Sequence, residues 1–189
     1  MPGAPIVGIL LAAGSASRFG GDKLLALLPD RRPIGVAALE HLAAVVDTVV
    51  AVVRPHDHAL MATYAARGAR IATCWRAADG MGVSLAWGVR AAPVAAGWVI
   101  ALADMPWVQP ATIALVTAAL RKGALVAAPS CHGTRGHPVG FAAACYAELT
   151  TLVGDEGARP IVARHQAVLI ETGDAGILRD VDIPRDLEA

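Results

Sequence analysis

The chain has 189 residues, which is long enough for one domain with a sizeable core, and 56% of them are hydrophobic. Its 16 lysines and arginines balance 16 aspartates and glutamates, so the basic excess of a nucleic-acid binder is missing. No apolar run approaches the roughly 18 residues of a membrane span, and three widely spaced cysteines without a CxxC pair favour a reducing compartment. We therefore predict a single cytoplasmic domain over residues 1–189 that engages neither nucleic acid nor membrane.

Short apolar runs alternate along the chain with longer amphipathic ones. The apolar runs predict strands over residues 6–12, 48–53, 70–74, 98–103, 125–128 and 167–171. The amphipathic runs predict helices over residues 33–46, 57–67, 83–92, 110–121, 142–152 and 158–164. Pro110 suits a first helical turn, and Gly68 and Gly123 suit helix ends. This alternation predicts an open α/β sheet, in which ligands bind beyond the carboxyl ends of the strands.

A glycine-rich loop from Gly14 to Lys23 follows the first predicted strand. Ala16 breaks the GxGxxG pattern of dinucleotide-binding loops, and the GxxxxGK[ST] spacing of the P-loop is absent as well. The small residues of this loop let backbone N–H groups approach a phosphate, and Arg18 and Lys23 can neutralise its oxygens. The alternative is an ordinary flexible loop with two solvated cations.

Two aspartates follow apolar runs and precede a proline by two residues. Asp104 comes after the fourth predicted strand, at the ligand edge of the sheet, and Asp182 lies near the end of the chain. Both are candidate metal ligands, because Mg²⁺ prefers a few carboxylates together with phosphate oxygens of a substrate. The alternative roles are a turn for Asp104 and a helix cap for Asp182, with Pro184 in the first turn of a final helix.

Two further loops carry polar groups. Between the third strand and the third helix, Gly80 and Gly82 permit close backbone approach to a flat ring that Ser84 can hydrogen-bond, although a plain helix start is the alternative. Arg135 and His137 lie on a glycine-rich loop before another apolar strand. There His137 either contacts a substrate or has no role.

Two other patterns indicate nothing catalytic. Cys131, His132 and His137 do not have the spacing of a zinc site, and no second ligand pair accompanies them. Asp57 and His58 are interpreted as a solvated helix start.

Taken together, these segments resemble the MobA/MocA-type nucleotidyltransferases, nearest their molybdenum-cofactor cytidylyltransferase branch. The resemblance covers nearly the whole chain. It is carried by LAAGSASRFGGDKLL (residues 11–25), DGMGVSL (79–85), LADMP (102–106), RGHPVGF (135–141), GDEGAR (154–159) and DVDIP (180–184). It implies a three-layer, Rossmann-like α/β fold of the nucleotide-diphospho-sugar transferase type, with a mostly parallel sheet and helices on both faces. It also implies Mg²⁺-dependent transfer of a nucleoside monophosphate from a triphosphate to a phosphorylated acceptor, with release of pyrophosphate.

The resemblance also assigns roles by position. The residues implied in nucleotide binding are Leu11, Ala12, Ala13, Gly14, Arg18, Lys23, Gly80, Met81 and Ser84. The residues implied in catalysis are Arg18, Lys23 and Asp104, and those implied in holding Mg²⁺ are Asp104 and Asp182. The residues implied in acceptor binding are Arg135, Gly136 and His137.

Ala13 bears on the choice of nucleotide. In this family the guanylyltransferase branch usually has a glycine there, and a methyl group leaves less room for a purine. The resemblance thus implies CTP as the donor and molybdopterin as the acceptor, with a molybdoenzyme or its chaperone as a further partner. The alternatives are GTP as the donor, a sugar or polyol phosphate as the acceptor, or a non-catalytic chaperone that delivers the cofactor. An NAD-dependent oxidoreductase is disfavoured because GxGxxG is missing.

Overall fold

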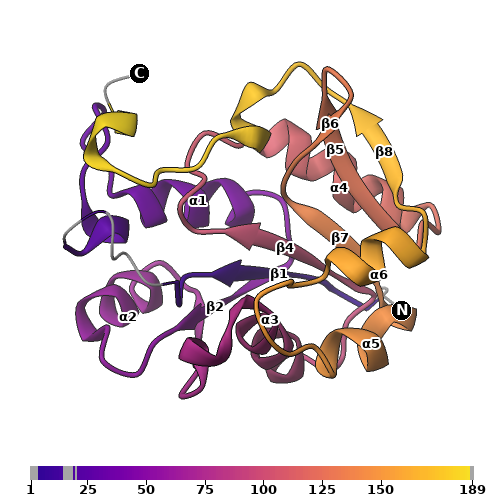
Figure 1. The fold of residues 1–189 in the computed structure, drawn as a ribbon, viewed down its shortest axis with the longest axis horizontal. Coiled ribbons are helices and arrows are strands. Elements are labelled where there is room, and N and C mark those ends of the chain that lie inside the picture. The colour runs from indigo at the N-terminus through magenta and orange to yellow at the C-terminus, as the bar shows by residue number, and fades with distance from the viewer. Residues whose placement is uncertain (1–3, 15–18, 20, 188–189) are drawn as a thin grey trace.

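The computed structural model describes residues 4–14, 19 and 21–187, and a mixed β-sheet runs through its middle (Figure 1). Within these residues the sheet has eight strands, in the order β3-β2-β1-β4-β7-β5-β6, and β8 also pairs with β5. The strands are β1 (Ile6–Leu11), β2 (Thr48–Val53), β3 (Arg70–Thr73), β4 (Gly97–Leu102), β5 (Val126–Cys131), β6 (Thr134–Arg135), β7 (Val139–Ala142) and β8 (Val168–Glu171).

Most neighbouring strands are parallel. β1 pairs in parallel with β2 and with β4, in a register that places Ile6 opposite Gly97 and Leu11 opposite Leu102. β7 is antiparallel to β4 and β5, and the two-residue strand β6 is antiparallel to β5. The central strands are apolar on both faces because helices cover both faces, as a parallel sheet requires.

Six α-helices in the described part of the chain form the outer layers. They are α1 (Ile34–Ala43), α2 (His58–Ala65), α3 (Met81–Ala91), α4 (Pro110–Arg121), α5 (Tyr146–Thr150) and α6 (Arg159–Arg164). Buried side chains of α1, α2 and α4 share one apolar core with the sheet, and those of α3, α5 and α6 share a second. Ile34 and Ala37 of α1 form a third, smaller cluster with Leu28 and Val181. None of these helices is long and apolar enough to cross a bilayer.

The predicted fold class is confirmed: the three-layer α/β architecture is the one expected from the sequence. Pro110 opens α4, and Gly68 and Gly123 adopt positive φ angles of 82° and 98° just beyond α2 and α4. The helix predicted over residues 142–152 is shorter, since a 3-10 turn (Ala143–Cys145) precedes α5. The apolar strand expected after the Arg135 loop is β7, whereas β6 was not predicted.

The topology places several strand ends together. The arrowheads of β1 and β4 point to the same side of the molecule (Figure 1). The C-terminal segment returns to this side, where the backbone N–H of Val181 donates to the carbonyl of Asp104 at 2.9 Å. Residues from both ends of the chain therefore meet beyond the carboxyl ends of the central strands.

Candidate active site

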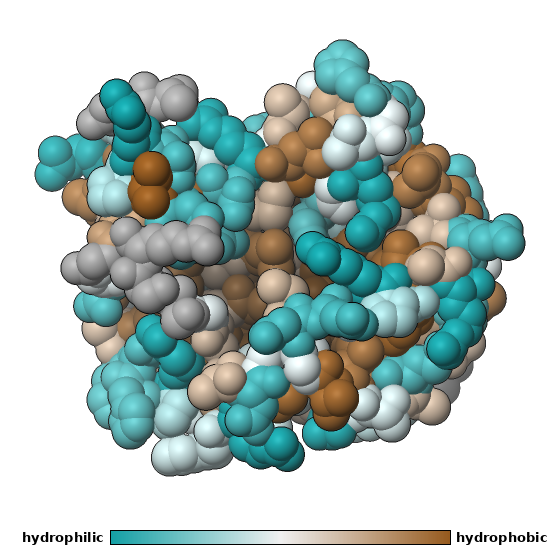
Figure 2. All heavy atoms as spheres, in the orientation of Figure 1, coloured by the Kyte–Doolittle hydropathy of each residue, from teal (hydrophilic) through white to brown (hydrophobic). Residues whose placement is uncertain are grey.

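A cavity of about 550 Å³ lies beyond the ends of β1, β2 and β4. This volume is in the range of small-molecule sites, which are usually a few hundred Å³. Figure 2 shows a hollow near the centre of this face, with apolar residues at its floor and hydrophilic side chains around it. The cavity is lined by every predicted nucleotide and metal residue that the structure describes: Leu11, Ala12, Ala13, Gly14, Lys23, Gly80, Met81, Ser84, Asp104 and Asp182. Arg18 lies outside the described residues.

Backbone and small side chains form the wall at the end of β1. The N–H of Ala12 donates to the carbonyl of Val52 at 2.9 Å, which continues the strand ladder one residue beyond β1. Ala13 is buried at 5% exposure, so its backbone is held in place by the core. Gly14 is different, since a Cβ built on it meets none of the described atoms within 4 Å. Gly14 also lines the cavity.

Charged groups gather where β4 ends. Lys23 begins a 3-10 helix (Lys23–Leu25), and its Nζ lies 2.8 Å from Oδ2 of Asp104 and 4.0 Å from Oδ1 of Asp182. Asp186 holds the Asp182 turn, because its Oδ2 accepts from the N–H groups of Asp182 at 2.7 Å and Ile183 at 2.8 Å. The same two hydrogen bonds keep the pKa of Asp186 below its usual range.

Asp104 and Asp182 fit a divalent cation, because one ammonium already lies within 4.0 Å of a carboxylate oxygen from each. The described residues contain no cluster of three or more histidine, cysteine or acidic side chains that suits a metal. A cation held here would thus take its other ligands from phosphate or water, as Mg²⁺ commonly does.

The end of β2 contributes polar residues that the sequence reading missed. Arg54 and Asp57 both line the cavity and form an ion pair, with 3.0 Å between Nε and Oδ2. Asp57 does stand at the start of α2, as predicted, but its side chain turns to Arg54 rather than capping the helix. The sequence does carry a signal for Arg54, because this residue directly follows a buried strand and ligands bind at the edge where such strands end.

A distant loop closes the cavity near the start of α3. The N–H of Gly82 donates to the carbonyl of Gly154 at 2.8 Å. A Cβ on Gly80 would lie 2.3 Å from the carbonyl carbon and oxygen of Gly154, so only glycine permits this contact. Gly80 also has φ 119° and ψ 169°, a conformation essentially restricted to glycine. The contact brings Asp155 into the cavity wall, a position that the sequence does not predict.

The predicted acceptor residues lie elsewhere. Arg135, Gly136 and His137 do not line the large cavity. Gly136 packs against the backbone of Ile177, whose carbonyl oxygen would lie 2.3 Å from a Cβ at that position. His137 borders a second, much smaller cavity, and Leu102 lines both cavities. An acceptor role for these three residues stays a prediction.

His137 is held in a neutral state. Its backbone N–H donates to the carbonyl of Ile177 at 3.0 Å, and its Nδ1 is buried without a hydrogen-bond partner among the described residues. Burial, assisted by the positive charge of Arg135, lowers the pKa of His137 to about 4.

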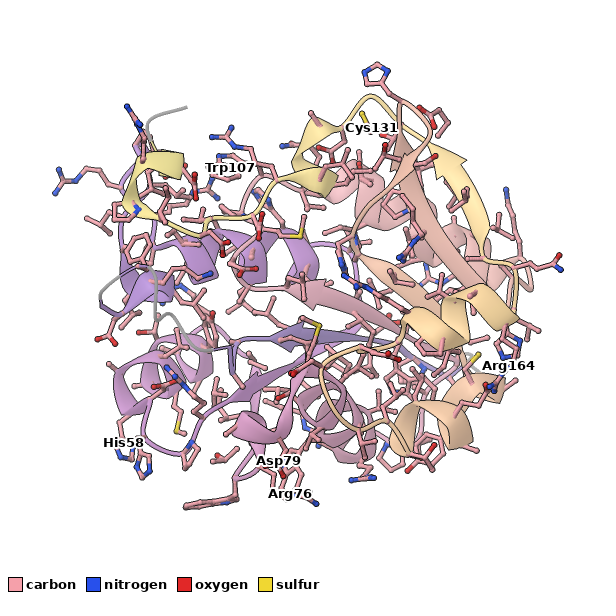
Figure 3. The ribbon with its side chains drawn as sticks, in the orientation of Figure 1. His58, Arg76, Asp79, Trp107, Cys131 and Arg164 are labelled. Atoms are coloured by element: carbon pink, nitrogen blue, oxygen red, sulfur yellow. The ribbon has the colours of Figure 1, made fainter. Side chains whose placement is uncertain are left out.

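Two other residues singled out in the sequence lie outside the cavity lining. Asp79 lies beside Arg76 (Figure 3), with 2.7 Å between its Oδ2 and Nε of the arginine. Cys131, also labelled in Figure 3, is buried at the end of β5. The motif around Gly80 therefore contributes Gly80, Met81 and Ser84 to the cavity, but not its aspartate.

Comparison with known proteins finds a matching family model, a related protein sequence and similar solved structures. A family model for the MobA-like NTP transferase domain matches residues 8–168. Purine catabolism protein PucB of Bacillus subtilis (strain 168) is 30% identical over 196 residues, covering 97% of this chain and 94% of PucB. The crystal structure of Rv0371c from Mycobacterium tuberculosis H37Rv is similar with a TM-score of 0.83 and 28% identity, covering 100% of both chains. A manganese complex of Rv0371c is similar with a TM-score of 0.74 and 25% identity, covering 96% of this chain and 92% of that one.

Proposed function

Because the chain belongs to the family of MobA-like NTP transferase domains, we propose that it is a Mg²⁺-dependent CTP:molybdopterin cytidylyltransferase. It transfers CMP from CTP to the phosphate of molybdopterin and releases pyrophosphate. The observation that carries this proposal is the meeting of Lys23, Asp104 and Asp182 in one cavity with the glycine-rich backbone around Gly14 and Gly80.

The glycine-rich walls suit the base of the nucleotide. A Cβ at Gly14 would meet none of the described atoms within 4 Å, so this position leaves room for a ligand. Gly80 lines the cavity at the start of α3. Ser84 lines the cavity on α3, and its hydroxyl is a hydrogen-bonding group at this wall for a ring that enters there, although only 5% of the residue is exposed. The methyl group of Ala13 is buried in the core behind this wall, and the wall position that it sets favours a pyrimidine over a purine.

The charged wall suits the phosphates. Asp104 and Asp182 would hold Mg²⁺, whose chemistry is to neutralise phosphate oxygens and stabilise the charge that develops during transfer. The manganese complex of Rv0371c supports a divalent metal in a relative of this chain. Lys23 supplies a positive charge to the same phosphates, and positive charges placed in advance stabilise the transition state without reorganising.

The reaction requires no general base from the protein. An oxygen of the acceptor phosphate forms a bond to the α-phosphorus of CTP, and the bond from that phosphorus to pyrophosphate breaks. A phosphate monoester is already ionised near neutral pH, so no proton has to be removed. The task of the chain is to hold two anions in line, and positioning of this kind supplies much of an enzyme's rate.

The acceptor is assigned from the sequence motifs RGHPVGF and GDEGAR, which resemble the molybdopterin branch of the family. The second motif forms the loop that places Asp155 in the cavity wall. The first contains His137, which lines the small second cavity, and Leu102 lines both cavities.

Pyrophosphate release by the purified protein tests the proposal. Each of the four NTPs is supplied with Mg²⁺, with and without molybdopterin, and the organic product is identified by mass. We expect release with CTP only when molybdopterin is present, and Asp104→Asn should lose it. Equal turnover of GTP would refute the assignment of the donor. Turnover with a sugar phosphate but not with molybdopterin would refute the acceptor, and the absence of turnover with any NTP would refute transferase activity.

A further inference from the structure

Lys23 occupies the place that the proposed function reserves for a metal ion. Its Nζ lies 2.8 Å from Oδ2 of Asp104 and 4.0 Å from Oδ1 of Asp182. Its side chain is 11% exposed, whereas those of Asp104 and Asp182 are 28% and 51% exposed. The ammonium is thus the more enclosed partner and is placed toward both carboxylates at once.

A divalent cation and this ammonium compete for the same oxygens. Mg²⁺ coordinates carboxylate oxygens at about 2.1 Å, which is inside the hydrogen-bond distance at which Lys23 holds Oδ2 of Asp104. Two cations so close together repel each other, and the low exposure of Lys23 leaves little water to screen that repulsion. A metal held by Asp104 and Asp182 would therefore displace the ammonium of Lys23 from these carboxylates.

A bound nucleotide would offer the Lys23 ammonium an alternative partner. Its charge lies at the end of a flexible four-carbon stem, so it can turn without moving the backbone. Its 3-10 helix begins at Lys23, and the two residues before it, Gly21 and Asp22, line the cavity. Phosphate oxygens in the cavity would replace the carboxylates as partners of the ammonium.

We propose that Lys23 is an internal counter-ion, which holds the Asp104–Asp182 site in the empty protein and moves to the phosphates when metal and nucleotide bind. This rests on the proposed function, because it takes the two carboxylates as the metal site. Its consequence is a coupling: nucleotide raises metal affinity by removing the competitor, and metal raises nucleotide affinity to the same extent. The empty protein binds metal weakly because its own lysine is in the site.

Metal binding without nucleotide provides the test. The probe is Mn²⁺, and its free concentration is read from its electron paramagnetic resonance signal. The variant Lys23→Met removes the ammonium and should bind Mn²⁺ on the order of tenfold more tightly than the unaltered protein, which is within the usual range of such couplings. The matched control is Lys122→Met, because Lys122 is the chain's only other lysine and is exposed just beyond α4.

The outcomes separate this inference from the proposed function. Asp104→Asn should abolish Mn²⁺ binding. If the Asp104→Asn protein binds Mn²⁺ as tightly as the unaltered protein, the assignment of Asp104 to the metal site is wrong, and the proposed function loses its metal site. If Asp104→Asn loses Mn²⁺ while Lys23→Met binds it no more tightly than Lys122→Met, the metal site stands and the counter-ion role is wrong.

A second measurement uses the unaltered chain, so it does not depend on the folding of a variant. Protein labelled with ¹³C-lysine gives two sets of side-chain signals, because the chain has only two lysines. Addition of Mg²⁺ with CTP should shift the signal of the Lys23 ε-carbon and leave that of Lys122 in place. A Lys23 signal that stays unchanged at saturating Mg²⁺ and CTP would overturn the proposal.

Discussion

The contact between Gly80 and the Gly154 loop makes a prediction whose size follows from the geometry. Gly80→Ala places a Cβ 2.3 Å from the Gly154 carbonyl, which is too close for backbone atoms that do not move. The backbone angles of Gly80, φ 119° and ψ 169°, cost an alanine about 1–3 kcal/mol. Relief of the clash also breaks the hydrogen bond from Gly82 to Gly154, at about 0.5–1.5 kcal/mol.

We therefore expect Gly80→Ala to lower the free energy of unfolding by about 2–4 kcal/mol, and the Tm by roughly 5–15 °C for a chain of this size. Urea denaturation followed by circular dichroism measures the first quantity. Two alanine substitutions serve as controls, because neither creates a contact within 4 Å. Gly68→Ala has a positive φ and should cost about 1 kcal/mol, whereas Gly173→Ala should stay within about 0.5 kcal/mol of the unaltered protein.

Affinity for CTP is measured on the same variants, since the Gly154 loop can detach while the core stays folded. In that case Gly80→Ala loses CTP affinity with a smaller loss of stability. A Gly80→Ala protein that matches Gly173→Ala in both its free energy of unfolding and its CTP affinity would refute the reasoning.

Three further predictions follow from single residues. Gly14→Ala should leave the free energy of unfolding within about 0.5 kcal/mol of the unaltered protein, because its Cβ meets no described atom within 4 Å. It should weaken CTP binding roughly tenfold, because Gly14 lines the cavity and the methyl group takes up room there. Unchanged affinity in a calorimetric titration would contradict this. Ala13→Gly should move the ratio of kcat/KM for CTP and GTP toward GTP, about tenfold for one methyl group, and a ratio equal to that of the unaltered protein would argue against a role in base choice. The pKa of His137 is lowered to about 4, so the unfolded chain takes up this proton first, and stability should fall by about 2–3 kcal/mol as the pH drops from about 6.5 to 4. His137→Gln should remove that part of the pH dependence in urea titrations at pH 7 and pH 4.5, and an unchanged slope would show that His137 is not the group responsible.

The parallel half of the fold follows from local sequence patterns. β1, β2 and β4 are short apolar runs, and each strand from β1 to β4 is followed along the chain by an α-helix. The handedness of such strand–helix–strand units is fixed by the twist of the strands. The antiparallel half depends on long-range pairing that no local pattern specifies. β7 inserts between β4 and β5, and β6, which pairs with β5, is two residues long, too short to give a period of its own.

In the site, too, some residues can be predicted from the local sequence, whereas others depend on contacts between distant segments. Residues that directly follow a strand, such as Gly14 and Asp104, could be placed at the ligand edge from the sequence. Asp155 could not, because it reaches the cavity only through the contact of Gly154 with Gly80, which lies 74 residues earlier in the chain. Four glycines lie where the start of α3 meets the loop before α6, and the sequence alone does not show that these two segments are in contact. They are Gly80, Gly82, Gly154 and Gly157.

The structure changes how Ala13 should act on base choice. Its side chain is 5% exposed and belongs to the apolar core on the α3 side of the sheet, so little of the methyl group is available to touch a ligand. A role in base choice must then work largely through the position of the wall that the core holds in place. Loss of the methyl group should therefore affect the protein twice, by widening the cavity and by lowering the free energy of unfolding by about 1 kcal/mol. A change in selectivity without a loss of stability would mean that the methyl group faces the base directly.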